Sequence, residues 1–321
     1  MPLADVPFDR TLIPNPWPSA HAASVVALPG GRLLASWFAG SHEGAPDVAI
    51  VTAAFDGERW SQPRAVVDTP GHPDGNSVLW VDPAGVLRIW YVTMEGRGWA
   101  MCPVRERRSH DGGETWSDAA YVRQKHGWMV RNEPLFHAGR VLMPMYDERD
   151  WTAFVLHSED GETWTRSPKV YEKGTGLIQP AIAPTGDGRL LMLLRSTAGA
   201  VYAARSLDET GTAWTAPQRT ALPNPNSAVE LIRLDSGALL CVCNPTARGR
   251  TPLRVALSDD DGVTWPRWRD IESEPGEYSY PAAMQAADGV VHLLYTHRRR
   301  AIAHAQLTEG WVRGGAPHGA V

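Results

Sequence analysis

The chain has 321 residues, of which 43% are hydrophobic and 21% charged, and its formal net charge is -5. This acidic balance does not point to nucleic acid or an anionic membrane as a partner, and no apolar run reaches the roughly 18 residues of a membrane helix. The first ten residues carry neither the basic stretch nor the apolar stretch of a signal peptide, so we expect a cytoplasmic protein. The three cysteines, Cys102, Cys241 and Cys243, are too few for a disulfide framework and do not have zinc-site spacing, so we expect buried free thiols.

Six apolar runs that each follow a glycine recur along the chain at intervals of 54, 54, 49, 49 and 52 residues. In chain order, these glycines are Gly31, Gly85, Gly139, Gly188, Gly237 and Gly289. Another short apolar run precedes each glycine, as in 22–28 and 229–234. Pairs of short apolar runs joined by Gly, Asp and Pro predict antiparallel hairpins, and no stretch of any length shows helical periodicity.

A motif that ends in tryptophan follows each of these pairs. The copies end at Trp60, Trp116, Trp164, Trp214, Trp265 and Trp311, which are 56, 48, 50, 51 and 46 residues apart. The second, third and fifth copies are the clearest, with Ser, Asp, Gly, Thr and Trp in order, and the last keeps only Glu-Gly-Trp. Asp and Gly form a tight turn in which the Asp side chain caps backbone N–H groups, and Trp covers the gap between sheets. We therefore expect Asp111, Asp160 and Asp260 to be structural.

Each unit is thus predicted to contain a strand, a Gly turn, a second strand, a third strand that leads into the Trp-ended turn, and a fourth strand. Four-stranded units repeated at about fifty residues are typical of propeller blades. The predicted fold class is all-β, a six-bladed β-propeller of four-stranded antiparallel blades, with 1–321 forming one domain. Such a ring has a central axis, and we expect the functional site at one mouth of it.

A polar residue begins each of the six expected inner strands. These residues are His21, Asn76, Asn132, Gln179, Ser227 and Tyr280, which lie 10, 9, 7, 9, 10 and 9 residues before their glycines. The residues seven positions after the glycines are Phe38, Val92, Tyr146, Arg195, Asn244 and Thr296. A hairpin places the start of one strand beside the end of the next. We therefore expect a cluster of His21, Gln179, Arg195, Tyr280, Tyr146 and Asn244, while polar residues that simply begin strands near loops would explain Asn76, Asn132 and Ser227 equally well.

Arg195 is the strongest sign of a ligand in this set. It ends the apolar run 190–194, where an unpaired charge would be costly. We therefore expect Arg195 at the mouth of the ring, facing an anion.

The Trp-ended turns are similar to Asp boxes, and through them the whole chain resembles the sialidase (neuraminidase) superfamily, in its bacterial BNR/Asp-box branch. The resemblance implies three arginines on a substrate carboxylate, a tyrosine nucleophile activated by a glutamate, and an aspartate acid/base. By position it assigns Arg195 and Arg250 to the second and third arginines, Asp47 to the acid/base and Tyr280 to the nucleophile. Tyr278 is the rival nucleophile, because it opens a Tyr-Ser dipeptide like that of the family.

Two positions depart from the family pattern. His21 stands where the family's first arginine opens an Arg-Ile-Pro motif, and Gln179 stands where the glutamate polarises the tyrosine. Loss of one arginine weakens carboxylate binding, and a glutamine amide does not take a proton from a phenol with a pKa of about 10. His21 is then either an acid/base or a hydrogen-bonding partner of a sugar. Glu43 either replaces the lost carboxylate or is a solvated loop residue.

Three functions are compatible with these residues. The first is a glycosidase for an acidic sugar, in which Arg195 and Arg250 bind the carboxylate, Tyr280 is the nucleophile and Asp47 the acid/base. The second is a lyase on a uronate, in which Tyr280 and His21 share the proton transfer. The third is a non-catalytic carbohydrate-binding propeller. The predicted substrate-binding set is Arg195, Arg250, Gln179, Glu43, Tyr146, Asn244, Tyr278 and Asn132. We expect an anionic small-molecule or oligosaccharide ligand, and no cofactor, metal, nucleic acid or membrane.

Overall fold

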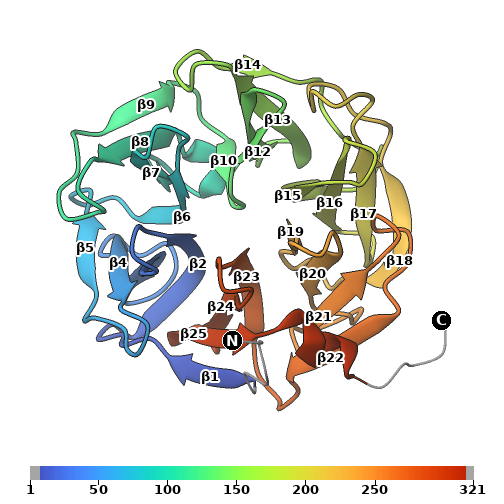
Figure 1. Cartoon of the computed structure of the whole chain (residues 1–321). Helices are drawn as coiled ribbons and strands as arrows, with labels where there is room; N and C mark the ends of the chain where they lie inside the picture. The colour runs from blue at the N-terminus through green and yellow to red at the C-terminus, as the bar shows by residue number, and fades with distance from the viewer. Residues whose placement is uncertain (1–7, 316–321) are drawn as a thin grey trace.

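The computed structural model describes residues 8–315 as a ring of six antiparallel sheets around one axis (Figure 1), which confirms the predicted six-bladed β-propeller. Blade 1 contains β2 (Ser19–Ala27), β3 (Leu33–Gly40), β4 (Ala49–Phe55) and β5 (Arg64–Val67). Blade 2 contains β6 (Asp74–Val81), β7 (Leu87–Thr93), β8 (Val104–Ser109) and β9 (Ala120–Arg123). Blade 3 contains β10 (Trp128–Val130), β11 (Leu135–His137), β12 (Arg140–Asp147), β13 (Thr152–Ser158) and β14 (Thr165–Arg166).

The other three blades follow the same plan. Blade 4 contains β15 (Leu177–Pro184), β16 (Leu190–Ser196), β17 (Ala200–Arg205) and β18 (Gln218–Pro223). Blade 5 contains β19 (Glu230–Arg233), β20 (Leu239–Cys243), β21 (Leu253–Ser258) and β22 (Arg267–Glu272). Blade 6 contains β23 (Tyr278–Gln285), β24 (Val291–His297), β25 (Ala301–Leu307) and β1 (Asp9–Leu12). The first strand of each blade in chain order lies nearest the axis, except that β1 is the outermost strand of blade 6.

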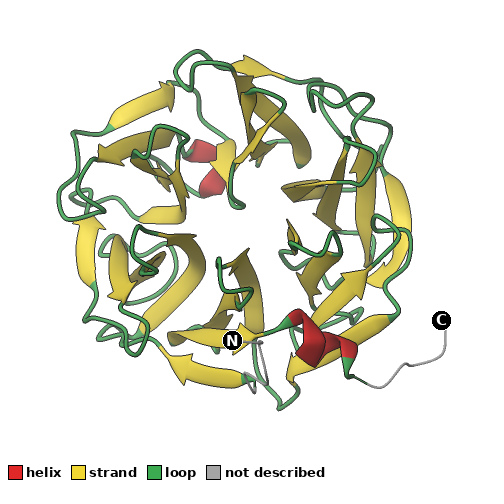
Figure 2. Ribbon diagram, viewed as in Figure 1, coloured by secondary structure: helices red, strands yellow, loops and turns green. Residues whose placement is uncertain are grey.

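Helix is confined to two short segments of the described chain, as Figure 2 shows: the 3-10 helix η1 (Trp99–Met101) and the α-helix α1 (Glu309–Arg313). Neither is long and apolar enough to span a membrane. The blades pack through apolar faces, and Cys241 and Cys243 are buried free thiols in the same cluster between blades 4 and 5. Cys241 and Cys243 lie on the same side of β20, as expected for residues two apart on a strand.

The outer strand of the last blade comes from the other end of the chain. Strand β1 pairs with β25 from Asp9 opposite Gln306 to Leu12 opposite Ala303. The expected fourth strand after Trp311 is therefore wrong, and so is the expected sixth Trp-ended turn. Trp311 lies in α1, where its backbone N–H donates to the Thr308 side chain at 3.1 Å.

The clear Trp-ended turns are structural, as predicted. In blade 2, Asp111 Oδ1 accepts from the Ser109 hydroxyl at 2.7 Å and from the Thr115 N–H at 2.9 Å. Asp160 and Asp260 make the matching contacts in blades 3 and 5. Each Asp side chain is occupied by the turn it closes and is therefore unavailable for chemistry.

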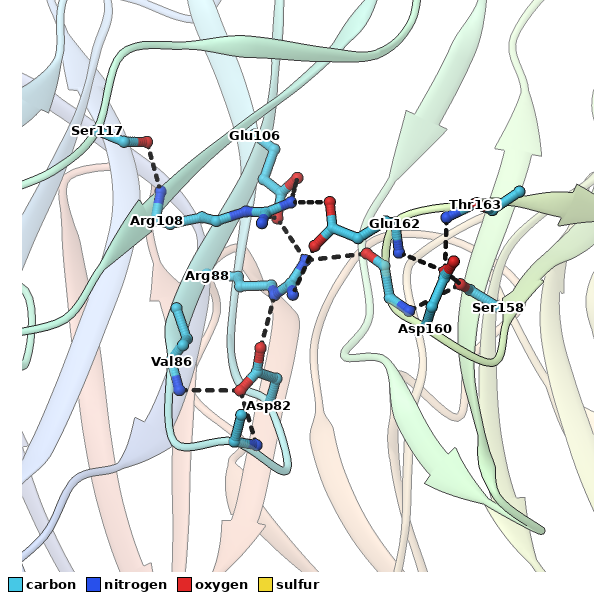
Figure 3. Close-up of polar contacts among 12 residues, drawn as sticks. Asp82, Val86, Arg88, Glu106, Arg108, Ser117, Ser158, Asp160, Glu162 and Thr163 are labelled. Carbon is cyan, nitrogen blue, oxygen red and sulfur yellow. Dashed lines mark hydrogen bonds and ion pairs between the residues drawn. The ribbon is translucent and has the colours of Figure 1, made fainter.

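A buried arginine joins one blade to the Trp-ended turn of the next (Figure 3). Arg88 on β7 donates to Asp82 at 2.9 Å and to Glu106 at 3.0 Å within blade 2. It also donates to the backbone carbonyl of Gly161, in the turn of blade 3, at 3.0 Å. Arg88 also lies 3.3 Å from the Glu162 carboxylate of blade 3, so the buried guanidinium is paired within its own blade and also contacts the next blade.

Four inner strands, β2, β6, β15 and β23, each contain a β-bulge at the equivalent place in the blade. In each bulge two residues of the inner strand lie opposite one residue of its partner strand. In each bulge a non-glycine residue adopts a left-handed conformation: Ala22, Asn76, Gln179 and Tyr280, with φ of 56°, 46°, 53° and 54°. His21 pairs with Phe38 one position earlier, so it is Ala22 that is equivalent to the other three. The expected alignment of His21 with them is therefore wrong by one residue.

Candidate active site

Tyr280 is the centre of a polar cluster on the axis. Its hydroxyl oxygen accepts from Arg195 Nη1 at 3.1 Å and from Gln179 Nε2 at 3.3 Å. The centroid of its ring lies 4.2 Å from that of His21. Residues from blades 1, 4 and 6 therefore meet at this one side chain. The left-handed bulges of β15 and β23 turn Gln179 and Tyr280 toward each other.

The surroundings of Tyr280 favour its phenolate. Burial alone raises the pKa of the phenol. The positive charges of Arg195 and Arg250 and the hydrogen bond from Gln179 lower the pKa by more than burial raises it, so the net pKa lies below its ordinary value. No carboxylate is hydrogen-bonded to Tyr280 among the described residues. The described cluster thus stabilises the phenolate through cations, with no carboxylate base in contact with the phenol.

Two predicted arginines converge on Tyr280. Arg195, at the end of β16, is held by Asn226 at 2.8 Å and by the Gln179 side-chain oxygen at 3.0 Å. Arg250, in the loop between β20 and β21, places its guanidinium carbon 5.5 Å from the centre of the Tyr280 ring. A carboxylate bound between them would have charged donors on two sides.

Arg131 is a third arginine at the ring, and the sequence-based reasoning missed it. Its guanidinium carbon lies 5.1 Å from the centre of the Tyr280 ring. It is buried at the axis and donates to the backbone carbonyls of Ala23, at 3.3 Å, and Pro281, at 2.8 Å, so it ties blade 3 to blades 1 and 6. Burial lowers its pKa. The signal in the sequence was the polar stretch after Val130, which splits the inner strand of blade 3 into β10 and β11.

A chain of ion pairs joins the loops above Tyr280. Glu277 accepts from Arg250 at 2.8 Å and from Arg299 at 2.8 Å, and Arg299 also pairs with Glu43. Glu43 is therefore neither a free loop residue nor a hydrogen-bonding partner of Tyr280, because its carboxylate pairs with an arginine of the β24–β25 turn. Glu277 and Arg299 were not predicted; both flank strands of blade 6, and their other partners, Arg250 and Glu43, come from blades 5 and 1.

Asp47 lies in the loop between β3 and β4, four residues after Glu43. It is exposed, and its carboxylate accepts from the Ser41 hydroxyl at 2.8 Å and the Ser41 N–H at 3.1 Å. These hydrogen bonds, led by that of the hydroxyl, lower its pKa. Asp47 is therefore ionised at neutral pH in the free protein, and its predicted role as acid/base stays a prediction.

His21 is buried beside Tyr280, with only 1% of its surface exposed. Burial lowers its pKa well below 6.5, and the charges of four arginines lower it further; these are Arg299, Arg250, Arg131 and Arg195. The imidazole is therefore uncharged at neutral pH.

The remaining predicted site residues divide into two groups. Tyr146 belongs to the cluster, because its hydroxyl accepts from Asn76 at 3.0 Å and from Gln179 at 3.4 Å. Asn244 instead holds the backbone carbonyls of Pro252 and Tyr278, each at 2.9 Å. The side chain of Asn244 therefore braces loops and is not bonded to the cluster.

Tyr278 and Asn132 also make structural contacts. The Tyr278 ring packs in the apolar cluster between blades 5 and 6, and its hydroxyl accepts from Arg298 at 3.2 Å. Asn132 donates to the carbonyls of Pro180, at 2.9 Å, and Gln179, at 3.3 Å. Of the two tyrosines considered as nucleophile, only Tyr280 contacts the arginines and Gln179 of the cluster.

A separate cavity of about 140 Å³ lies on the axis, and Asn132, Glu133 and Glu230 are among its lining residues. Burial raises the pKa of Glu230 to about 7, although the charge of Arg131 opposes the shift. Within residues 8–315, no group of three His, Cys, Asp or Glu side chains is placed to hold a metal ion.

Comparisons with known proteins agree with the fold. The model of the BNR repeat-like domain matches residues 31–293. A sialidase from Micromonospora viridifaciens is 24% identical over 350 residues, which cover 93% of this chain and 53% of that protein. The chain thus spans about half the length of this curated relative.

Two solved structures show the same architecture. The Hadza microbial sialidase Hz136 superposes with a TM-score of 0.79 at 19% identity, covering 92% of this chain and 66% of that chain. An α-L-arabinofuranosidase from Fusarium graminearum superposes with a TM-score of 0.73 at 13% identity, covering 94% and 98% respectively. These likenesses show a sialidase-like glycoside hydrolase fold. The chain belongs to the BNR repeat-like domain family, within the sialidase superfamily.

Proposed function

We propose that this protein is a sialidase-like glycosidase that acts on a sugar bearing a carboxylate. The observation that supports it most is the convergence of Arg195 and Arg250 on Tyr280, with a contact of 3.1 Å from Arg195 to the phenol oxygen. A planar guanidinium matches a carboxylate, and two of them fix its orientation beside the phenol. The related protein of Micromonospora viridifaciens is a sialidase, which agrees with this proposal.

In this proposal Tyr280 is the nucleophile. Its oxygen attacks the anomeric carbon while the bond from that carbon to the leaving oxygen breaks, and water later releases the sugar from the tyrosine. The leaving oxygen needs a proton, for which Asp47 is the proposed donor. Because Ser41 holds Asp47 ionised in the free protein, the proposal requires that the bound sugar cover this carboxylate and raise its pKa.

The test compares chromogenic α-glycosides of N-acetylneuraminate and glycosides of glucuronate with matched neutral glucosides and galactosides. We expect kcat/KM to be at least about 100-fold higher for acidic substrates, and Arg195→Met to remove most of this preference. Equal hydrolysis of neutral and acidic glycosides would contradict the proposal, whereas binding of the acids without turnover would leave a carbohydrate-binding propeller.

A second candidate function is elimination on a uronate, and the contacts of Tyr280 favour it specifically. Its hydroxyl oxygen accepts hydrogen bonds from Arg195 and Gln179, which would stabilise a phenolate without a partner carboxylate. The phenolate would remove the proton from C5, the C4–O bond would break to leave a C4=C5 double bond, and the new phenol would return the proton to the leaving oxygen. Incubation with uronate-containing oligosaccharides separates the two reactions, because only elimination yields a product with new ultraviolet absorbance.

A further inference from the structure

The cavity of about 140 Å³ lies further along the axis than the cluster around Tyr280. Two of its lining residues, Ile182 and Ala283, follow Gln179 and Tyr280 by three positions on the same strands, which corresponds to about 10 Å along each strand. The cavity opens to solvent, because several of its lining residues are partly exposed, among them Leu135, Pro184 and Ile232. Its volume has room for several water molecules or for a head group with a short chain.

Three acceptor side chains from blades 3 and 5 line this cavity. Asn132 is 3% exposed, and its side-chain nitrogen donates to three backbone carbonyls at 2.9 to 3.4 Å, so the orientation of the amide is fixed. The Asn132 Oδ1 is therefore left buried without a partner among residues 8–315, and the same holds for Oε1 of Glu133. Glu230 is 5% exposed and accepts from the Leu231 N–H at 2.8 Å. Buried acceptors without donors indicate that a donor from outside the chain fits here.

The charges around the cavity do not balance within the described chain. Arg131 is the one cation there whose charge lowers the pKa of both Glu133 and Glu230, and its guanidinium donates to backbone carbonyls. The residues of β15 and β23 that line the cavity are apolar. Two ionised carboxylates and one guanidinium leave one negative charge uncompensated. Burial therefore raises the pKa of Glu133 well above its ordinary value and that of Glu230 to about 7.

We propose that this cavity binds the primary ammonium group of a small alkylamine. An ammonium group carries three N–H donors, which match Asn132 Oδ1 and the carboxylates of Glu133 and Glu230. Its single charge also cancels the uncompensated one.

The rest of the lining favours an alkyl chain over a hydrated metal ion. Apolar side chains make up most of it, as with Leu135, Ile182 and Leu231, and these would cover the methylenes of the amine. Calcium and magnesium instead take six or more oxygen ligands, and a divalent ion would add an excess positive charge beside Arg131. This inference does not rest on the proposed function.

Titration calorimetry of the full chain at pH 8 tests the ligand class, with methylamine, propylamine and butylamine as probes. We expect affinity to rise along this series, because each added methylene is buried. Butanol lacks the charge and tetramethylammonium lacks the N–H donors, so both should bind at least about tenfold more weakly than butylamine. Butylamine should also bind about tenfold more weakly at pH 6 than at pH 8, because protonation of Glu230 removes a partner.

Two variants test the carboxylates. Glu133→Gln and Glu230→Gln keep the size of the side chain and should each weaken butylamine by at least about tenfold. Glu209→Gln removes the same charge at an exposed position and should leave the affinity unchanged. Because each glutamine removes an unpaired buried charge, we expect the ligand-free variants to unfold at a midpoint no lower than that of the original protein, which separates lost binding from misfolding.

Several results overturn the proposal. Equal affinity for butylamine and butanol would show that no charge is recognised, and butylamine affinity that survives both glutamine substitutions would place the amine elsewhere. Tighter binding of calcium or potassium chloride than of butylamine would make the cavity a metal site. If none of these cations binds, the cavity holds water only. If a variant unfolds at a lower midpoint, the comparison of butylamine with butanol and tetramethylammonium on the original protein decides.

Discussion

Tyr280 shows how much a single backbone position decides in this protein. With φ at 54° it occupies a region that non-glycine residues rarely adopt, at a cost of about 1–3 kcal/mol. The bulge that imposes this conformation also points the phenol toward Arg195 and Gln179. Tyr278, two residues earlier on the same strand, faces the core instead. The strained position is therefore the one that meets the polar groups of the axis.

This contrast predicts different results for two conservative substitutions. Tyr280→Phe should lower kcat by at least about 1000-fold, because it removes the reacting oxygen, yet ligand affinity should change by only a few-fold, because the ring still packs under Arg131 and Arg250. Tyr278→Phe, the matched control, loses a hydrogen bond from Arg298 and should keep nearly full turnover. Steady-state kinetics measure kcat and calorimetry measures ligand affinity for the two variants. A larger loss of kcat in the Tyr278 variant would mean that Tyr278, and not Tyr280, supplies the reacting oxygen.

The pH dependence of turnover should report the charge of Arg195. In the proposed reactions the reactive form of Tyr280 is the phenolate, and the charge of Arg195 helps to lower its pKa, so we expect the rising limb of kcat/KM to lie below the ordinary pKa of tyrosine. Arg195→Met should move this limb to higher pH, because one stabilising cation is lost. Arg195→Lys keeps the charge and should leave the limb in nearly the same place. If neither substitution moves the rising limb of kcat/KM, that limb reports the titration of a group other than Tyr280.

At the level of elements, the contact between one blade and the turn of the next carries stability. Arg88→Met would leave the buried Asp82 without its cation and Glu106 with only the partly exposed Arg108, so we expect the free energy of unfolding to fall by roughly 3–5 kcal/mol. Arg108→Met is the control, because Arg108 is a partly exposed neighbour in the same network, and about 1 kcal/mol or less is expected. Urea unfolding measures the two, and equal losses would mean that burial of the charges is unimportant here.

The elements that could be predicted from sequence are those that repeat. Gly turns and Trp-ended turns recur because each blade solves the same local packing problem, so strand order and blade number follow from their period. The one-residue shift at His21 was not predictable, since in a bulge two residues oppose one and spacing alone does not locate the pair. Arg131 was also missed, because its partners come from other blades, and so was the pairing of Glu277 with Arg299, which lie 22 residues apart in the chain.

At the level of the whole molecule, the pairing of β1 with β25 closes the ring. Deletion of residues 8–12 would expose the edge of β25 and remove the ion pair of Arg10 with Glu272. We expect a loss of about 3 kcal/mol of stability and increased self-association, from a few ladder hydrogen bonds at about 1 kcal/mol each. Unfolding curves and light scattering test this, with Arg10→Met as the control for the ion pair alone. An unchanged unfolding midpoint would show that the other blades hold the ring by themselves.

The seam between blades 1 and 6 should also make stability depend on pH. Trp60 donates to His304 at 3.1 Å, and His304 in turn is 2.9 Å from His292. Burial lowers the pKa of His304 from 6.5 to about 3, with a further contribution from His292. Between these two values the unfolded chain binds the proton and the folded chain does not, so this stability is complete above pH 6.5 and falls as the pH drops toward 3.

The size of this loss is roughly 3–5 kcal/mol over the whole interval. Urea unfolding at several pH values measures it. His304→Gln, which does not titrate, should flatten the slope between pH 6.5 and 4, while the exposed His110→Gln should leave the slope as it was. A slope that is equally steep in the His304 variant would assign the effect to other groups.

The closure by β1 also sets an order of events during synthesis. Asp9 leaves the ribosome long before Gln306, its partner in the last blade, and Tyr280 is itself made in that blade. The first strand must therefore wait unpaired while five blades form behind it. His21, Arg131 and Tyr280 meet only when blade 6 has packed against blades 1 and 3. A chain that stops before the last blade would lack Tyr280 and its contacts with His21 and Arg131, so binding of a ligand at the axis would report that the last blade has been made.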